Sequence, residues 1–384
     1  MIKNKFLFLA YFIAFTDGFY TAMYQYTLVD VTSSLNVGAA VFGSMMGVLV
    51  AVQFFSSIIP PLIFGRIADR IGKKPVILLG YAVWVAGLII MAQSASFAAV
   101  AAASVLLGMG FSLVVSNASA AIADEAAIDS TKQLNRSLMF FCVGGGVAPA
   151  VSAMLMGMGL HWRMLYILVA ALCVIYSAAL APMKLKVPVR KPEEKSARGI
   201  LRQPVFLLAA ACFLVYGGLE TGSGSFADAF CMQVFPDTGI SSAALTALWA
   251  GMVPARGIAG FIRLSKFKIV YISVAVAFAA FVGIAFSTSG WLTVLMFALA
   301  GFGLGALWPT LAGIFSDAYP QNSGMVMSVA IAAGGVSSMG IPLLMGYAKD
   351  ITGRFSSSYI LLFLFAAVLF IVFSRLDRSC KKKI

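Results

Sequence analysis

Long apolar runs are the feature that most restricts how this chain can fold. A helix that crosses a bilayer needs about 20 mostly apolar residues, and twelve such runs fill most of the sequence. Of the 384 residues, 61% are hydrophobic and 11% charged, whereas soluble domains have about 25% charged residues. We therefore predict an all-α membrane protein. The expected spans cover residues 6–31, 40–64, 75–93, 97–122, 137–159, 164–182, 204–233, 242–262, 268–288, 291–315, 324–347 and 357–374.

The basic residues predict the orientation of these spans. Of the 27 Lys and Arg, Arg256 lies inside an expected span, and only Arg163, Lys349 and Arg354 fall in one of the two sets of loops. Positive charge collects in cytoplasmic loops, so the other set of loops and both termini are expected to be cytoplasmic. The same distribution accounts for the net charge of +13 without any nucleic-acid partner.

A long polar connection divides the expected spans into two sets of six. The charged, proline-containing stretch Met183–Pro204 separates an N-terminal half (1–182) from a C-terminal half (204–384), with residues 183–203 as a cytoplasmic linker. The segments Gly108–Asp124 and Gly301–Asp317 share Gly at their first and third positions and Asp at their last. Repeated halves of this kind are typical of secondary transporters.

The string GRIADRIGKK (Gly65–Lys74) follows the second span on the expected cytoplasmic side. It is similar, at every specified position, to the loop signature of the major facilitator superfamily, G-x-x-x-D-R-x-G-[RK]-[RK]. This resemblance implies a twelve-helix fold of two pseudo-symmetric six-helix halves and a loop that latches the outward-open state. Asp69 would then face a helix N-terminus, where a carboxylate is favoured. The expected gating set is Gly65, Asp69, Arg70, Gly72, Lys73, Asp124 and Arg136, with Arg70 paired to an acid such as Asp124.

Two further strings bear on this loop. GYAKDITGR (Gly346–Arg354) has a similar spacing, but it follows the eleventh span on the expected outer side and cannot be the pseudo-symmetric latch. The expected counterpart is the degenerate GFIRLSKFK (Gly260–Lys268) between spans eight and nine.

Several short strings resemble the fucose–galactose–glucose/proton symporter family within the superfamily. They are YGGLETGSGSF in span seven, SNASAAIADE in span four, LNRSLMFFCVGGGVAP in span five, GMVPARG in span eight and FGLGALWPTL in span ten. This resemblance implies a sugar as the substrate and a proton as the coupling ion.

Two acids stand near the middle of spans, Asp17 in the first half and Glu220 in the second. A charged side chain at the bilayer centre costs at least about 2.5–3.5 kcal/mol, so a function is expected for each. A carboxyl group in a cavity that opens alternately to each side can load and release a proton, and either acid is a candidate carrier. The alternative is a structural pair in which they neutralise each other or Arg256.

Polar and aromatic residues near these acids are candidates for substrate binding, because rings stack on sugar faces while amides and acids bind hydroxyls. They are Tyr20, Tyr24, Gln53, Asn117, Tyr216 and Trp308. Each has a structural alternative: the tyrosines as packing residues, the amides as interhelical hydrogen-bond donors, and Trp308-Pro309 as a kink.

The sequence thus predicts a secondary active transporter that takes up a small hydroxylated solute with protons by alternating access. The first alternative is a proton-driven exporter of drugs or amphipathic metabolites, and the second is a membrane sensor. No arrangement of nucleophile and base suggests an enzyme, and a single histidine, His161, excludes a multi-histidine metal site. No cofactor is expected. We expect a monomeric, multi-pass protein, with a bacterial inner membrane as its location.

Overall fold

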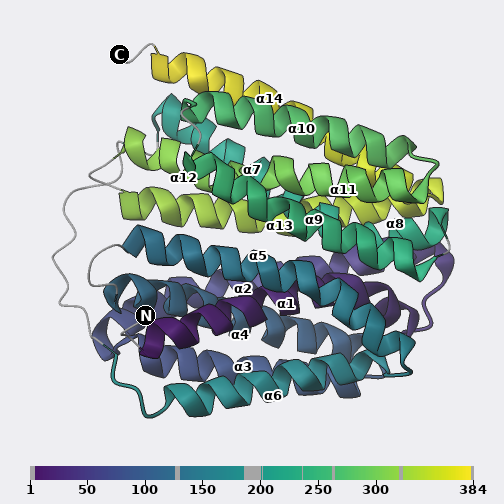
Figure 1. Cartoon of the computed structure of the whole chain (residues 1–384), viewed down its shortest axis with the longest axis horizontal. Helices are drawn as coiled ribbons and strands as arrows, with labels where there is room; N and C mark the ends of the chain where they lie inside the picture. The colour runs from purple at the N-terminus through teal and green to yellow at the C-terminus, as the bar shows by residue number, and fades with distance from the viewer. Residues whose placement is uncertain are drawn as a thin grey trace. The chain divides into compact units, whose positions relative to one another are not determined.

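The computed structural model is all-helical and describes residues 5–125, 130–185, 200, 202–235, 237–261, 264–319 and 323–381. The part of the linker at 186–199 lies outside the described residues. The helices are α1 (Lys5–Ser33), α2 (Phe42–Ile71), α3 (Lys73–Gln93), α4 (Phe97–Glu125), α5 (Ser130–Gly157), α6 (Trp162–Leu180), α7 (Pro204–Ser225), α8 (Ala227–Val234), α9 (Thr238–Phe261), α10 (Lys266–Phe286), α11 (Gly290–Gly305), α12 (Leu307–Ala318), α13 (Ser323–Thr352) and α14 (Ser356–Lys381), with a 3₁₀ turn at Ala39–Val41 (Figure 1).

Each expected span coincides with one helix or with two consecutive helices. The seventh span is divided into α7 and α8, and the tenth into α11 and α12. Within the described residues, 11 segments are long and apolar enough to cross a membrane, and α9 is not among them. The all-helical membrane fold is confirmed, whereas the count of twelve spans and the cytoplasmic position of the termini stay predictions.

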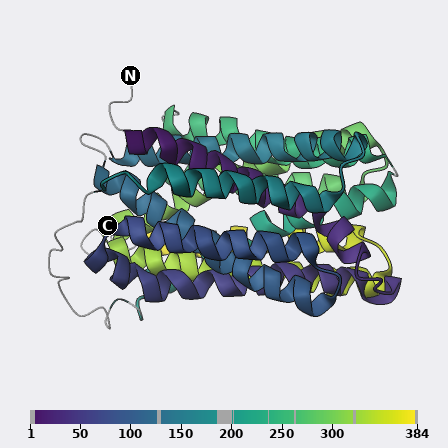
Figure 2. The same cartoon turned by 90° about the horizontal axis from the view of Figure 1, so that it is seen from below.

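The chain divides into two compact units. The first contains Met1–Val37 and Leu49–Pro192, and the second contains Gly38–Val48 and Glu193–Ile384. Residues Phe42–Val48, the first turns of α2, are therefore grouped with the second unit. Figures 1 and 2 show that the long helices within each unit run alongside one another, joined by short connections.

Corresponding helices pack in the same pairs within each unit. In the first unit α1 packs on α5, α3 on α4, and α3 on α6. In the second, α7 packs on α13, α10 on α11, and α10 on α14, which are the corresponding pairs if α7/α8 and α11/α12 each count as one span. The repeat seen in the sequence is therefore repeated in the helix packing.

The two repeated segments share glycines at positions where the helix packing leaves no room for a side chain. A Cβ at Gly110 would overlap the backbone of Trp84 on α3, and a Cβ at Gly303 would overlap the backbone of Ala277 on α10. Small residues allow membrane helices to approach this closely. Each glycine therefore sets the distance between its helix and the preceding span of its own unit.

Candidate functional site

The polar site of the second unit includes the break between α11 and α12 (Figure 1). Residue 309 is proline and has no backbone N–H, so it cannot donate to the carbonyl of Gly305 four residues earlier. Arg256 of α9 donates from Nε to this carbonyl oxygen at 3.3 Å. The hydroxyl of Tyr216 on α7 reaches the neighbouring carbonyl of Leu304 at 3.5 Å. The broken helix thus supplies acceptors for two side chains.

Glu220 lies beside the same arginine. Its Oε1 is 3.7 Å from the Nη2 atom of Arg256, and 27% of the Glu220 side chain is exposed against 13% of the Arg256 side chain. Arg256 therefore contacts both the carboxylate of α7 and the freed carbonyl of α11. This geometry corresponds to the structural alternative in which Arg256 balances the charge of Glu220.

The two other polar residues on the Glu220 face of α7 are occupied within the protein. Ser223 is fully buried and donates to the backbone carbonyl of Glu220 at 2.9 Å, while Tyr216 is 1% exposed. Trp308 is half-buried in the first turn of α12. A solute that reaches this site would therefore meet the Glu220 carboxylate and the Arg256 guanidinium.

Asp17 has a different environment in the first unit. Asp17 is 4% exposed, and its Oδ1 atom accepts no hydrogen bond from the described residues. The titratable groups facing it are Tyr81 of α3 and Cys173 and Tyr176 of α6. Within the described part of the chain, no cationic side chain forms an ion pair with it. Of the two predicted acids, Glu220 has a counter-ion, whereas Asp17 has none among the residues that the structure describes.

A small cavity adjoins Asp17. Its volume of about 30 Å³ is sufficient to hold a water molecule, which needs about 10–15 Å³ by this measure. The cavity follows α1 from Asp17 towards Ala10, and its polar lining also includes Ser119 of α4 and Ser137 of α5. Because α1 begins at Lys5, the cavity lies on the N-terminal side of Asp17, which is expected to be cytoplasmic.

The predicted aromatic ligands of the first unit are packed against other rings. Tyr20 is fully buried, with its ring 5.0 Å from that of Trp84 in an edge-to-face arrangement and 6.2 Å from that of Tyr24. Tyr24 is 4% exposed. Little of either ring surface is available to a solute in this conformation, as in the alternative that treats both residues as packing tyrosines.

The two predicted amide ligands are also buried. Asn117 donates from Nδ2 to the carbonyl of Leu113 in its own helix at 2.9 Å. Gln53 is 8% exposed, and its Oε1 atom has no hydrogen-bond partner among the described residues. Gln53 therefore keeps an acceptor that a ligand or a water molecule could use, whereas the amide donor of Asn117 is bound within its own helix.

The predicted gating loop forms the turn between α2 and α3. Gly72 has φ +93° and precedes the first residue of α3, so the turn uses a backbone conformation that favours glycine. Arg70 and Arg136 are exposed, Gly65 and Asp124 half-buried and Lys73 buried, while the Asp69 side chain lies outside the described part. The Arg70–Asp124 pairing stays a prediction.

The counterpart loop of the second unit does contain an ion pair. The Nζ atom of Lys266 lies 2.6 Å from Oδ2 of Asp317. Asp317 occupies the position in the repeated segment that Asp124 occupies in the first half. The degenerate string around Lys266 thus provides a cation to the repeated aspartate.

Sequence analysis missed a polar cluster in the second unit that joins α13 to the start of α2. Asp350 accepts hydrogen bonds from the backbone N–H groups of Gly43 at 2.9 Å and Ser44 at 2.7 Å. Lys349 donates to the carbonyl of Ala39 at 2.6 Å and pairs with Asp350 at 3.1 Å. A carboxylate is favoured at a helix N-terminus. Both Lys349 and Asp350 stand in GYAKDITGR, the string whose position on the expected outer side excludes it as the latch.

A further acid was missed because it lies close to Glu220 in sequence. Asp228 is in the first turn of α8, is 6% exposed and accepts a hydrogen bond from the hydroxyl of Ser241 on α9. The break at Phe226 between α7 and α8 turns the chain before this residue. Asp228 therefore joins α8 to α9 in the second unit.

Comparison with known proteins identifies the family. Residues 7–297 match the family model described as Major Facilitator Superfamily. The chain belongs to this superfamily. It is a multi-pass membrane protein with the corresponding helical fold.

A curated relative is Multidrug resistance protein D of Escherichia coli (strain K12), which is 25% identical over 239 residues. The match covers 61% of this chain and 58% of that protein, so the chain matches somewhat more than half of the relative's length. The finer resemblance to the sugar symporter family is not supported by this match and stays a hypothesis.

Solved structures share the fold over nearly the whole chain. A bacterial homologue of the human lysosomal transporter Spinster, inward-facing and unoccupied, has a TM-score of 0.77 at 14% identity and covers 98% of this chain and 97% of its own. The nucleoside transporter NupG, in a mutant form, also has a TM-score of 0.77, at 13% identity, with coverages of 97% and 100%. Identities this low indicate the fold and leave the substrate open.

Proposed function

We propose that this superfamily member is a proton-driven exporter of amphipathic small molecules, with Asp17 as the proton carrier. The observation that carries the proposal is the difference between the surroundings of Asp17 and those of Glu220. A buried carboxylate without a counter-ion is very costly and becomes neutral by binding a proton, whereas Glu220 has the guanidinium of Arg256 at 3.7 Å. Asp17 is therefore assigned the proton and Glu220 the permanent charge.

The proton would exchange through the cavity beside Asp17. One water molecule held there, with the hydroxyls of Ser119 and Ser137, links the carboxyl group towards the expected cytoplasmic side of the first unit. Gradient-driven transport requires that the proton bind to the acid from the opposite side of the membrane and be released on the expected cytoplasmic side. The protein supplies three groups for this step, the acid and the two hydroxyls, around a cavity too small for a transported solute.

The preference for an amphipathic substrate over a sugar has two supports. The rings of Tyr20 and Tyr24, which a sugar would need for stacking, are 0% and 4% exposed, and the curated relative is named a multidrug resistance protein. The carboxylate of Glu220 is partly exposed, which suits an amphipathic compound that carries a cationic group.

Sugar uptake with protons is the second candidate. The partly exposed Glu220, the guanidinium of Arg256 and the half-buried Trp308 form a combination of charge, hydrogen-bond donors and ring that could bind a polyol. The two candidates share the proton carrier and differ in the ligand at Glu220.

Reconstitution distinguishes the two functions. The purified chain would be placed in liposomes with an imposed pH gradient and offered sugars, amino acids and cationic dyes in separate assays. We expect dye movement against the direction of proton flow and no sugar accumulation. Sugar accumulation driven by the gradient, without dye movement, would establish the second candidate, and no gradient-dependent movement of any compound would refute proton coupling.

A further inference from the structure

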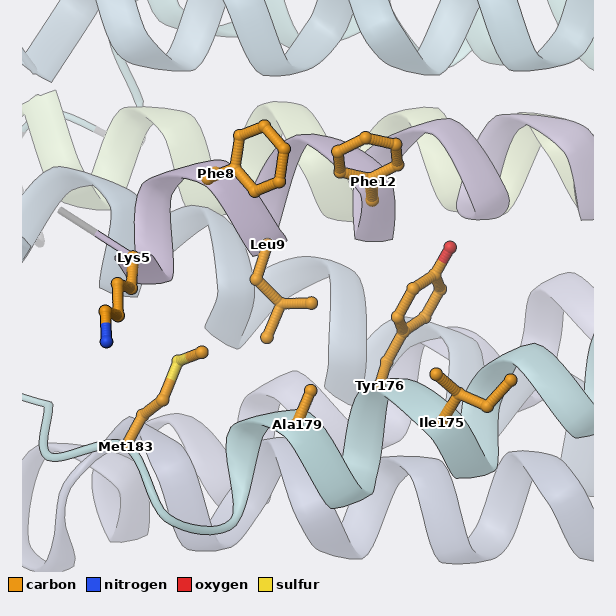
Figure 3. A pocket seen from close by; sticks show the side chains of 8 residues that line it. All are labelled: Lys5, Phe8, Leu9, Phe12, Ile175, Tyr176, Ala179 and Met183. Carbon is orange, nitrogen blue, oxygen red and sulfur yellow. The ribbon is translucent and has the colours of Figure 1, made fainter. Parts of the chain in front are cut away.

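The first unit also contains a groove between α1 and α6, separate from the site at Asp17 (Figure 3). Its volume of about 460 Å³ falls within the roughly 300–1,000 Å³ of ligand sites. The apolar lining consists of Phe8, Leu9 and Phe12 from α1 and Ile175, Tyr176 and Ala179 from α6. We call it the α1–α6 groove.

The groove opens on a surface that faces hydrocarbon. Phe8 is 56% exposed, Phe12 43% and Ile175 57%, and all three lie in segments apolar enough to span a membrane. Exposed rings and branched chains at such positions contact lipid tails. The occupant of the groove is therefore an apolar chain that arrives from the bilayer.

The two ends of the groove differ in the groups beside them. The hydroxyls of Thr16 and Tyr176 are joined by a 2.9 Å hydrogen bond that ties α1 to α6 beside the lining. At the opposite end, Lys5 of α1 and Met183 beyond the end of α6 complete the lining, and Figure 3 shows the Lys5 side chain directed from α1 towards Met183. An apolar chain with an anionic head matches this polarity.

Lys74 makes this charged end more favourable to an anion. The carboxyl end of a helix carries negative partial charge, which would repel a phosphate at the end of α6. Lys74 Nζ donates to the carbonyls of Ala181 at 2.6 Å and Met183 at 2.9 Å and so neutralises that end. The exposed lysines Lys5 and Lys184 then remain to bind a phosphate.

We propose that the α1–α6 groove binds an anionic glycerophospholipid, with one acyl chain in the groove and its phosphate at Lys5 and Lys184. Both lysines lie at the end expected to be cytoplasmic, the leaflet in which anionic lipids attract basic residues and basic pockets between spans hold their head groups. The lipid holds α1 against α6 next to Thr16, the neighbour of Asp17. The proposal does not depend on the transported substrate.

Native mass spectrometry of the full-length protein tests the proposal, with phosphatidylglycerol and phosphatidylethanolamine of identical acyl chains as probes. We expect preferential retention of phosphatidylglycerol. Each of Lys5→Gln and Lys184→Gln should weaken its binding about fivefold, which corresponds to about 1 kcal/mol per lysine. Lys268→Gln, at an exposed lysine of α10, makes the same charge change elsewhere and should leave the binding unchanged.

Filling the groove tests the acyl chain separately. Ala179→Trp should weaken the binding of both lipids, and the thermal unfolding of this variant reports whether it is folded. Equal retention of the two lipids, or unchanged retention in the double lysine variant, would overturn the head-group assignment. Unchanged retention in a folded Ala179→Trp protein would overturn the groove. Displacement of the lipid by a transported dye, with no effect of the lysine substitutions, would identify the groove as a cargo site instead.

Discussion

Arg256 donates to the carbonyl of Gly305 at 3.3 Å, the oxygen that Pro309 leaves without its usual helical donor. The same guanidinium lies 3.7 Å from Glu220. A proline on α12 thus leaves a carbonyl to which an arginine on α9 donates, and the same arginine lies beside an acid on α7. Three helices of the second unit are connected through one side chain.

Removal of the arginine should expose this dependence. Arg256→Ala leaves a carboxylate and a carbonyl without their donor, and we expect the free energy of unfolding to fall by about 1–3 kcal/mol. Adding Glu220→Gln should recover part of the loss, because a neutral amide needs no counter-ion. Thermal unfolding in detergent measures both.

The matched control is Lys266→Ala, which breaks the Lys266–Asp317 pair. Its side chains are 47% and 68% exposed, so the loss should stay within about 1 kcal/mol. Equal losses in Arg256→Ala and Lys266→Ala would show that the Arg256 contacts add nothing beyond a surface ion pair.

Restoring the missing N–H at position 309 should have the opposite effect on stability. In Pro309→Ala the new N–H competes with Arg256 for the Gly305 carbonyl, so we expect α11 and α12 to join, the melting temperature to rise and dye transport to slow. Pro149→Ala, within α5 of the first unit, also restores an N–H but leaves Arg256 untouched. If the melting temperature and the rate of dye transport changed equally in Pro309→Ala and Pro149→Ala, the break between α11 and α12 would have no specific role.

The two acids should respond differently to neutralisation. Asp17→Asn copies the protonated acid, so the melting temperature should change little while pH-gradient-driven transport is lost and exchange of labelled for unlabelled dye persists. Glu220→Gln removes the counter-ion of Arg256 and should lower the melting temperature. If Glu220→Gln abolishes gradient-driven transport but retains exchange, and Asp17→Asn leaves both intact, the assignment of the carrier is reversed.

The cavity beside Asp17 is testable through Ser137, which is 8% exposed. Ser137→Ala keeps the space and removes one hydroxyl, so gradient-driven transport should slow. Ser137→Leu fills the space and should stop gradient-driven transport while exchange continues. The rates of dye movement and of proton release from liposomes would be measured for both variants. Normal coupling in a folded Ser137→Leu protein would exclude this cavity as the proton route.

The contact of Asp350 with the start of α2 predicts a graded series. Asn is nearly as good an N-cap as Asp, whereas Ala at such a position costs about 0.5–2 kcal/mol. Asp350→Asn loses the charge interaction with Lys349 but keeps an acceptor oxygen, so its melting temperature should lie between those of the unchanged protein and Asp350→Ala. An Asp350→Ala protein as stable as the unchanged one would mean that these hydrogen bonds add no stability.

Local features of the sequence were sufficient for the family and for most helix positions. The apolar runs and the string GRIADRIGKK act through neighbours along the chain. The repeated glycines act through a helix contact that only a small residue permits, as at Gly110 and Gly303. Their physical effect is contained in residue type and spacing. The predicted halves and the kink at Trp308-Pro309 have this local origin as well.

The partners of the charged residues were decided by tertiary structure. Asp17 and Glu220 look equivalent in the sequence, since both are acids in the middle of apolar runs. Their difference arises because α9 brings Arg256 to Glu220 and to the Gly305 carbonyl, while the helices around Asp17 bring tyrosines, serines and a cavity. Asp350 likewise gained a partner 306 residues away at Ser44. The sequence shows that a charged residue lies within an apolar run and that its burial costs free energy. Only the packing of the helices determines which group offsets that cost.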